Sequence, residues 1–295
     1  MSKVSSSLGK KFTITNWAQS KRKGKPISMM TAYDFPSARF VDEAGINAIL
    51  VGDSVNMVVL GHDSTVSLTL EEQLHHCRAV ARGATRPFLI GDMPFMTYQV
   101  DPIEAVRNAG RFLKEGKMDA IKLEGGEEIA PTVHKIVQAG IPVMGHIGLT
   151  PQKISQLGGY RVQGRTADAA ASLVESAKVL EQAGCFSIVL ESVPSVVATH
   201  ISKTLKIPTI GIGAGSGCDG QVLVFHDVLG LYDDLNPRFV KRFANLKQEI
   251  IDALTAYRDE VEGRSFPAVE HTYTMKPEEE ALFIDLIESK NLGNN

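Results

Sequence analysis

Four carboxylates and one histidine in this 295-residue chain each follow a short apolar run. The segments INAILVGD, KMDAIKLE, CFSIVLE and IPVMGH illustrate the pattern. Carboxylates that lie together repel one another unless a cation neutralises them, and their oxygens are preferred ligands of Mg²⁺. A single acid at a strand end often only caps the next helix, but a group of them predicts metal-assisted acid–base chemistry. The residues in question are Asp53, Asp92, Glu124, His146 and Glu191.

The residue types narrow the individual roles. Glu191 follows the apolar run SIVL and suits the abstraction of a proton. His146 is either a core histidine bonded to backbone or a group that handles protons behind the metal ligands. Lys122 and Glu124 are two residues apart, so they face the same way on a strand. Lys122 therefore pairs with Asp92 or Glu124, or contacts the substrate; a neighbouring metal site disfavours a Schiff-base role.

The elements that position these side chains repeat one plan, in which a helix ends near a glycine and a buried strand follows. Gly45, Gly116, Gly140 and Gly184 occupy the helix-ending position, where glycine commonly supplies a left-handed residue. Apolar runs without alternation are typical of strands buried on both faces of a parallel sheet. Eight such strands are expected, near Ile27–Thr31, Ala48–Val51, Phe88–Ile90, Ala120–Leu123, Pro142–Met144, Ser187–Leu190, Thr209–Ile210 and Gln221–Phe225.

Eight strands with interleaved helices predict an α/β fold, specifically a (β/α)8 TIM barrel rather than a doubly wound sheet. The C-terminal ends of barrel strands converge at one end of the barrel, so the five ionisable side chains would lie together at that end. Thr69 with Glu72, and Asp101 with Pro102, predict helix starts. Pro237 is expected to open a long last helix whose apolar side comprises Phe239, Val240, Phe243, Leu246, Ile250 and Leu254.

The composition excludes several classes of protein. The 31 Lys and Arg against 34 Asp and Glu give a net charge of −3, which argues against a nucleic-acid binder that relies on bulk positive charge. No apolar run approaches the ~20 residues that a membrane span requires. Cys77, Cys185 and Cys218 are far apart and odd in number. They predict neither a disulfide framework nor a cysteine zinc site, and they fit a reducing compartment.

The glycine-rich segment GIGAGSG at 211–217 resembles a dinucleotide-binding loop but does not match it. Position 216 is Ser where that pattern has its third glycine, and the following GQVLVFHD predicts a strand instead of a helix. Two interpretations stay open. The loop after the seventh strand either lets backbone approach an anion, or is a tight turn without a ligand.

We expect three regions along the chain. Residues 1–26 form a basic arm with a short helix over Thr13–Ser20, residues 27–262 form a single-domain catalytic barrel, and residues 263–295 form an extension with an amphipathic helix. Residues 1–33 contain no acid, and their basic residues are lysines apart from Arg22. This favours a cytoplasmic protein, with mitochondrial import as the alternative.

From about Ile27 to Ser265 the chain resembles the ketopantoate hydroxymethyltransferase (3-methyl-2-oxobutanoate hydroxymethyltransferase) family. The motifs that carry the resemblance stand in the family's order. They are TAYD at 31–34, VGDS at 51–54, GHDST at 61–65, DMPFM at 92–96, IKLEGG at 121–126, GHIGLTPQ at 145–152, GGYRVQGR at 158–165, VLESVP at 189–194, IPTIGIGAG at 207–215 and DGQVLVFHD at 219–227.

The resemblance implies a TIM barrel of the phosphoenolpyruvate/pyruvate type that transfers a one-carbon unit from 5,10-methylenetetrahydrofolate to 3-methyl-2-oxobutanoate, giving 2-dehydropantoate through a Mg²⁺-stabilised enolate. It implies that Asp53 and Asp92 bind Mg²⁺ directly and that Glu124 completes the metal site. Ser54 and Lys122 would hold the 2-oxo acid, together with the two aspartates through the metal. Glu191 would accept the proton. The family also implies a homo-oligomer, often a decamer. The charge balance and the lack of a long apolar run predict no nucleic-acid or membrane partner.

Two other functions are compatible with the residues alone. A Mg²⁺-dependent 2-oxo-acid carbon–carbon lyase of the isocitrate lyase type would also enolise a metal-chelated substrate. Folate dependence would separate the two enzymes. A catalytically silent oligomeric barrel is the other alternative, and the intact set of carboxylates with Lys122 argues against it.

Overall fold

The computed structural model describes residues 9–233 and 237–292 of the chain. Residues divide into two compact units, Met1–Ala244 and Asn245–Asn295. The division lies earlier in the chain than the end of the barrel expected after residue 262. The beginning of the basic arm, residues 1–8, lies outside the described residues. No helix among the described residues is long and apolar enough to cross a membrane.

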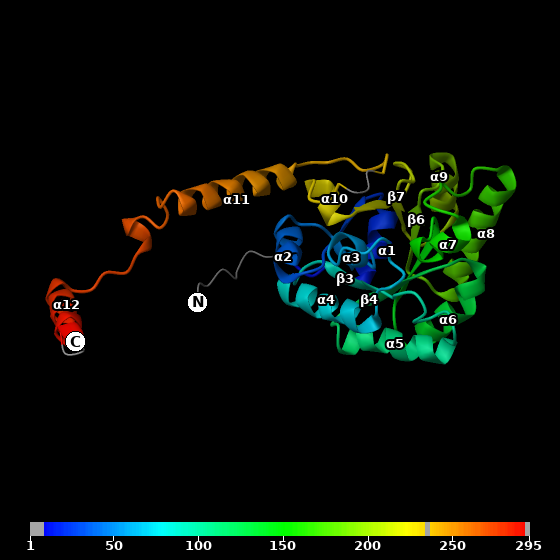
Figure 1. Cartoon of the computed structure of the whole chain (residues 1–295). Coiled ribbons are helices and arrows are strands. Elements are labelled where there is room, and N and C mark those ends of the chain that lie inside the picture. Colours follow the sequence, from blue (N-terminus) through cyan, green and yellow to red (C-terminus); the bar gives the residue numbers. More distant parts are fainter. Residues whose placement is uncertain (1–8, 234–236, 293–295) are drawn as a thin grey trace. The chain divides into compact units, whose positions relative to one another are not determined.

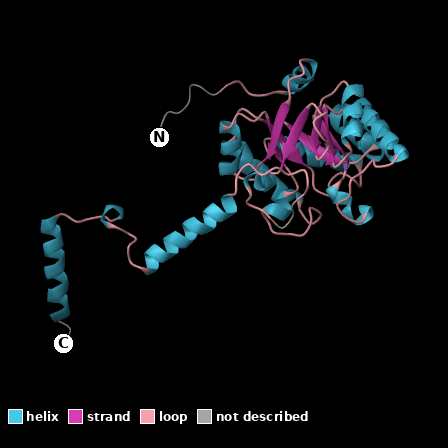
Figure 2. Cartoon of the chain, turned by 90° about the horizontal axis from the view of Figure 1, so that it is seen from above, coloured by secondary structure: helices cyan, strands magenta, loops and turns pink. Residues whose placement is uncertain are grey.

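The first unit is a closed barrel of eight parallel strands in the order β1 to β8, as the sequence predicted (Figure 1). Each strand pairs with the next, and β8 closes the barrel on β1. The strands lie side by side with helices around them (Figure 2). Their bounds are β1 Ile27–Thr31, β2 Ala48–Val51, β3 Phe88–Asp92, β4 Ala120–Glu124, β5 Val143–Gly148, β6 Ser187–Glu191, β7 Thr209–Ile212 and β8 Gly220–Leu223.

Helices follow or precede the strands of this unit. The predicted capping box is present: Thr69 Oγ1 accepts from the Glu72 N–H, and Glu72 Oε2 accepts from the Thr69 N–H. The helices are α1 Ile14–Arg22, α2 Phe35–Glu43, α3 Val55–Val58, α4 Leu70–Gly83, α5 Pro102–Lys114, α6 Ala130–Gln138, α7 Ile154–Leu157, α8 Ala167–Ala183, α9 Ser195–Thr204 and α10 Phe225–Leu229, with 3-10 turns η1 Glu127–Ile129 and η2 Pro151–Lys153.

Three of the four glycines that were predicted to end helices have the expected left-handed backbone conformation. Gly45, Gly140 and Gly184 have φ of +76°, +86° and +104°, the left-handed values that end a helix. Gly116 was predicted to do the same, but the left-handed residue there is Lys117, at φ +59°. Gly116 is small for another reason, because an added Cβ would lie 2.7 Å from the Phe112 carbonyl oxygen.

The strands separate two apolar cores. Side chains that point outward, such as Ile49, Ile121 and Leu190, pack against the helices in the larger core. Side chains that point inward, such as Ile90 and Val189, fill the barrel in a second core. Successive residues of a strand point to opposite faces, so each strand contributes to both cores in alternation.

Aromatic residues close the barrel at the end where its strands begin. Trp17 of α1 is fully buried and meets Phe12, Phe88 and Phe186 edge to face, with ring centroids 6.1, 5.9 and 5.3 Å away. The short helix expected near Thr13–Ser20 therefore exists and carries this plug. Offset edge-to-face pairs are favoured by the ring quadrupoles and add to the apolar area that is buried.

The glycine-rich loop after β7 is explained by close packing. An added Cβ at Gly213 would lie 2.7 Å from the ring of Phe239, and one at Gly215 would lie 2.6 Å from Ser195 Cβ. Both glycines also have positive φ, +64° and +81°. Of the two interpretations left open, the tight turn is the one for which the structure gives a physical reason.

The second unit contains α11 Leu246–Glu262, the 3-10 turn η3 Val269–His271 and α12 Pro277–Leu292. The prediction that Pro237 opens the last long helix was wrong, because α11 begins at Leu246 and Phe239 packs on the glycine loop instead. In α12, Ile284 lies on the opposite side from Leu282. An amphipathic helix requires its apolar side chains to lie on one face. The apolar side chains of α12 do not meet this requirement.

Candidate active site

The charged side chains that point into the barrel from β3, β4, β5 and β6 lie at the end where these strands finish. On β4 the inward positions read Ala120, Lys122 and Glu124, two residues apart. The same step leads from Ile90 to Asp92 on β3, from Met144 to His146 on β5 and from Val189 to Glu191 on β6. Because a strand repeats every two residues, the apolar interior below and the charged group above lie on one face. The prediction that the five ionisable side chains lie together at one end of the barrel is confirmed.

Lys122 is buried among three carboxylates. Its Nζ donates to Asp92 Oδ1 at 2.7 Å and Oδ2 at 2.9 Å, and it lies 3.7 Å from Glu124 Oε1. Asp92 Oδ2 also accepts from the backbone N–H of Asp53, at 3.1 Å. Only 3% of Lys122 is exposed, so its charge depends on these partners. Of the roles left open from the sequence, the structure shows the ion pair.

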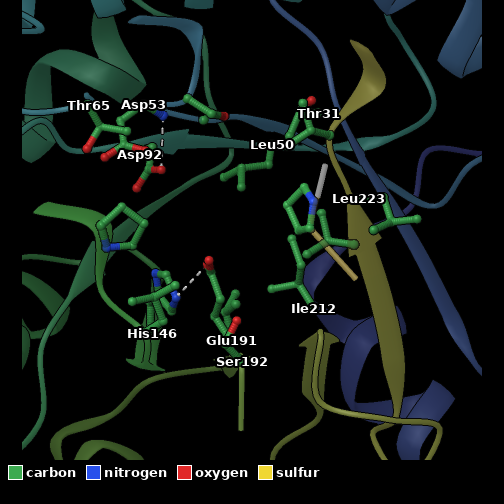
Figure 3. A pocket seen from close by; sticks show the side chains of 18 of the residues that line it. Thr31, Leu50, Asp53, Thr65, Asp92, His146, Glu191, Ser192, Ile212 and Leu223 are labelled. Carbon is green, nitrogen blue, oxygen red and sulfur yellow. Dashed lines mark hydrogen bonds and ion pairs between the residues drawn. The ribbon is translucent and has the colours of Figure 1, made fainter. Parts of the chain in front are cut away.

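His146 lies between Glu124 and Glu191. Its Nδ1 is 3.2 Å from Glu124 Oε1, and its Nε2 is 3.2 Å from Glu191 Oε2. Both contacts lie off the hydrogen-bond axis, so they are charge contacts. Figure 3 shows His146 and Glu191 directed toward one another at the edge of the cavity. The histidine therefore connects the buried carboxylates to Glu191, which is partly exposed to the cavity.

Two residues of the site, Gln152 and Tyr98, were not predicted from the sequence. Gln152 Nε2 donates to Asp53 Oδ2 at 2.9 Å, and the Gln152 N–H donates to Glu124 Oε2 at 3.1 Å. The buried Tyr98 hydroxyl donates to Gln152 Oε1 at 2.7 Å and accepts from the Glu124 N–H at 3.0 Å. Gln152 thus connects two candidate metal ligands. It belongs to the motif GHIGLTPQ, but nothing in that motif marks its side chain as part of the site.

Burial and like charges act against one another in this cluster. Burial and the charges of Asp92 and Glu124 hold the pKa of Asp53 well above its usual range. Burial also raises the pKa of Asp92, although Lys122 opposes it. Glu124 differs: burial acts against its ionisation, but His146 and Lys122 outweigh it, and its pKa is lowered. Burial and like charges therefore oppose ionisation of the two aspartates, whereas the neighbouring His146 and Lys122 favour ionisation of Glu124.

The protonation of His146 follows from its neighbours. Burial and the charge of Lys122 oppose a proton on the ring, but Glu124 and Glu191 outweigh them and raise the pKa of His146 to about 9. The ring is then positively charged at neutral pH, and its charge faces the carboxylates on both sides. His146 is then the second cation of the cluster, beside Lys122.

The charged groups form the floor of a cavity of about 480 Å³. Asp53, Asp92 and His146 gather on one side of it, and the apolar Ile212 and Leu223 face them across the cavity (Figure 3). Ser54, which also lines the cavity, contacts the buried Tyr33 hydroxyl, with 2.8 Å between the two oxygens. Ser192, directly after Glu191, has a φ of +49°, an uncommon value for a residue other than glycine.

The donor set suits a hard cation. Asp53, Asp92 and Glu124 offer only oxygens, which Mg²⁺ prefers, and the raised pKa of Asp53 shows that added positive charge would be favourable there. Within residues 9–233 and 237–292, however, no three His, Cys, Asp or Glu side chains are already grouped as a metal site. Lys122 and Gln152 occupy contacts that a cation would share. The metal assignment stays a prediction.

Solved structures of similar fold place the barrel in a known class. A crystal structure of phosphonopyruvate hydrolase matches with a TM-score of 0.58 and 13% identity, covering 97% of this chain and 99% of that one. A structure of 2,3-dimethylmalate lyase, described as a PEP mutase/isocitrate lyase superfamily member, matches with a TM-score of 0.53 and 16% identity, covering 95% and 97%. The barrel thus has the fold of that superfamily, and identities this low establish the fold alone.

The sequence identifies the family within this fold. The family model for ketopantoate hydroxymethyltransferase matches residues 11–269. A 3-methyl-2-oxobutanoate hydroxymethyltransferase from Oleidesulfovibrio alaskensis is 57% identical over 86% of this chain and 88% of its own. The enzyme of that name from Syntrophobacter fumaroxidans is 57% identical over 90% and 94%. The chain belongs to the ketopantoate hydroxymethyltransferase family.

Proposed function

We propose that this chain transfers a hydroxymethyl group from 5,10-methylenetetrahydrofolate to 3-methyl-2-oxobutanoate and forms 2-dehydropantoate. Membership of the family supports this reaction. The observation that carries it is the row of contacts from Glu124 through His146 to Glu191. This row ends in a carboxylate at the side of a cavity whose floor holds Asp53 and Asp92. A proton acceptor thus faces a site for a charged substrate.

The floor of the cavity suits the binding of a 2-oxo acid. Asp53 and Asp92, with Glu124 behind them, would hold Mg²⁺. When bound, this ion would act as a Lewis acid that polarises the 2-oxo group. Lys122 and Ser54 would meet the carboxylate of the substrate, since Lys122 carries positive charge and Ser54 an oxygen that can donate. The apolar Leu50, Val189 and Ile212 would face the branched end of the acid.

Glu191 would accept the proton from C3 of the acid. His146, whose Nε2 lies 3.2 Å from Glu191 Oε2, would hold this carboxylate in position beside the cavity. The carbanion left at C3 forms a bond to the methylene carbon of the folate, or to formaldehyde released from it. Water supplies the hydroxyl group as the carbon–nitrogen bonds break. The protons lost from C3 and water end on the two folate nitrogens, so tetrahydrofolate leaves.

Proton NMR of 3-methyl-2-oxobutanoate in D₂O tests the first step of this proposal. With the protein, Mg²⁺ and tetrahydrofolate present, the methyl doublet should collapse to a singlet as deuterium replaces hydrogen at C3. EDTA should prevent the collapse if Mg²⁺ is required. Addition of methylenetetrahydrofolate should then give 2-dehydropantoate. A doublet that persists with folded, Mg²⁺-binding protein would reject this substrate, and oxaloacetate and pyruvate would be tested next.

A further inference from the structure

The cavity is larger than its charged floor needs. Its volume of about 480 Å³ lies in the range of ~300–1,000 Å³ that is usual for ligands of drug size. A five-carbon 2-oxo acid at the floor would leave much of this space free. Part of the remaining wall comes from two segments, one containing Tyr160 and Val162 and the other containing Pro237, Arg238 and Phe239. We call these five residues the rim.

The segments that carry the rim are basic. Residues 158–166 read GGYRVQGRT and residues 237–244 read PRFVKRFA, so together they contain five Arg or Lys and no Asp or Glu. The chain as a whole has a net charge of −3, so this concentration of positive charge is local. Asp227 lines the cavity nearby, and the charge of Arg242 acts on it. An anionic group would be attracted to the rim at low ionic strength.

Both segments are held in place by the strands that form the site. The Gln163 N–H donates to the Ser192 carbonyl at 2.9 Å, which ties the first segment to the residue after Glu191. The ring of Phe239 covers Gly213, whose position leaves no room for a Cβ. The Tyr160 hydroxyl donates to Met57 Sδ at 3.6 Å. The rim is therefore built on the ends of β6 and β7 and faces the same cavity as the floor.

The rim side chains have free binding capacity. Arg238 is exposed, lines the cavity and makes no hydrogen bond or ion pair with another described residue. Tyr160 and Val162 are 46% and 49% exposed although both line the cavity. Aromatic faces accept flat ring systems, and a guanidinium accepts carboxylates as a planar pair of donors. The rim thus offers both kinds of contact within one opening.

We infer that the rim binds the one-carbon carrier itself, with the flat pterin among Tyr160, Val162 and Phe239 and the glutamate carboxylates of its tail against Arg238 and the other basic side chains of the two segments. This inference rests on the proposed function, because a folate is the anionic aromatic ligand that the reaction requires. It assigns the carrier a subsite separate from the charged floor. The 2-oxo acid and the carrier then occupy different parts of one cavity.

Charge reversal at the rim tests the tail contact. Arg238→Glu should raise the KM for methylenetetrahydrofolate about five- to tenfold, as expected for replacing an attraction by a repulsion at an exposed site. The loss should be larger for a triglutamate carrier than for the monoglutamate, and higher salt should reduce it. Arg107→Glu, which places the same charge change on the exposed face of α5, is the matched control and should leave this KM unchanged.

The exchange of the C3 proton separates the rim from the floor. Arg238→Glu should exchange deuterium into 3-methyl-2-oxobutanoate at the wild-type rate under saturating Mg²⁺ and tetrahydrofolate. If Arg238→Glu and Arg107→Glu show the same carrier KM for both tail lengths, the rim assignment is overturned while the proposed function stands. If the wild-type protein neither exchanges the proton nor uses the carrier, the proposed function itself fails.

The aromatic contact has its own test. Tyr160→Leu keeps an apolar side chain but removes the ring, so it should weaken tetrahydrofolate binding in calorimetry severalfold and leave 2-oxo-acid binding unchanged. Tyr160→Phe keeps the ring face and should bind like the wild type. Equal binding of the carrier by all three proteins would remove Tyr160 from the subsite. A parallel loss of 2-oxo-acid binding would place the residue at the floor instead.

Discussion

The two ends of the barrel are built by the same eight strands but are filled in opposite ways. At the end where the strands begin, Trp17 packs edge to face against Phe88 and Phe186. At the end where they finish, Lys122 is buried among carboxylates. Apolar packing at the first end is favourable without any ligand. The second end instead holds like charges close together, which the fold alone does not require.

Stability and chemistry are assigned to different parts of each strand. Buried charges cost free energy unless they are paired, and a hydrophobic replacement of a buried ion pair is often neutral or stabilising. The charged end therefore gives the fold little stability beyond what apolar residues at the same positions would give. Under the proposed function, its residues bind the substrate and the metal and move protons. If that division holds, substitutions at the two ends should affect different measurements.

Glu191→Gln is expected to have the largest effect and to change the rate alone. Removing the proton acceptor should lower kcat and the C3 exchange rate by about 10²–10⁴-fold, the usual contribution of a general base. Glu191 is not fully buried and the amide is of similar size, so the urea midpoint should hardly move. A near-normal exchange rate would mean that another group, with His146 next in line, takes the proton.

Trp17→Ala should produce the converse result at the other end of the barrel. Removing a fully buried indole from an aromatic cluster should lower the unfolding free energy by about 3–5 kcal/mol. The kcat of the protein that remains folded should be close to wild type. Urea denaturation and kinetics on the same samples would measure both. Phe40→Ala removes a ring that is 61% exposed and should cost less than about 0.5 kcal/mol.

Gln152→Ala would sharpen the comparison inside the charged end. Loss of the side chain removes the amide donor to Asp53 Oδ2 and to the Met93 carbonyl, and leaves the Glu124 carbonyl as the acceptor for the buried Tyr98 hydroxyl, at a cost of about 1–3 kcal/mol. If Gln152 positions a metal ligand, Mg²⁺ affinity measured by calorimetry should fall together with kcat/KM. Gln99→Ala removes an exposed neighbour of Gln152 and should not change Mg²⁺ affinity. Equal affinities in both variants would make Gln152 merely structural.

The smallest expected effect is a pH dependence near the starting end of β3. Burial opposes ionisation of Asp42, but the Thr85 amide and Arg86 outweigh it and lower the pKa of this carboxyl below its ordinary value of 3.8. A lowered pKa stabilises the protein above the ordinary value, and this stability is lost as pH falls through the folded value. Asp42→Asn should therefore remove about 1 kcal/mol at neutral pH and less at low pH.

Urea denaturation from neutral to acidic pH would measure this dependence. The difference in unfolding free energy between wild type and Asp42→Asn should shrink as pH falls. The exposed Asp63→Asn is the control and should have an unfolding free energy close to that of the wild type. A constant difference for Asp42→Asn would show that its effect comes from packing and hydrogen bonding, independent of charge.

Much of the fold and of the site could be predicted because both depend on local patterns. Buried strands appear as continuous apolar runs, and a charged residue that ends such a run marks the rim of a barrel. Gln152 could not be found this way, because its side chain reaches Asp53 across 99 positions of the chain. Phe239 was misassigned since it has the spacing of a helical apolar face, and only the packed structure brings it over Gly213.

The alternation of inward and outward side chains also bears on how such proteins diverge. The outward residues of a strand hold the helices, while the last inward residues carry the charges. A change at Lys122 or Glu191 therefore leaves neighbouring outward positions such as Ile121 and Leu190 untouched. New chemistry can arise on this scaffold with few substitutions and little rearrangement. The separation of outward and inward positions is compatible with the shared fold of barrels that are only 13–16% identical to this chain and whose names describe different reactions.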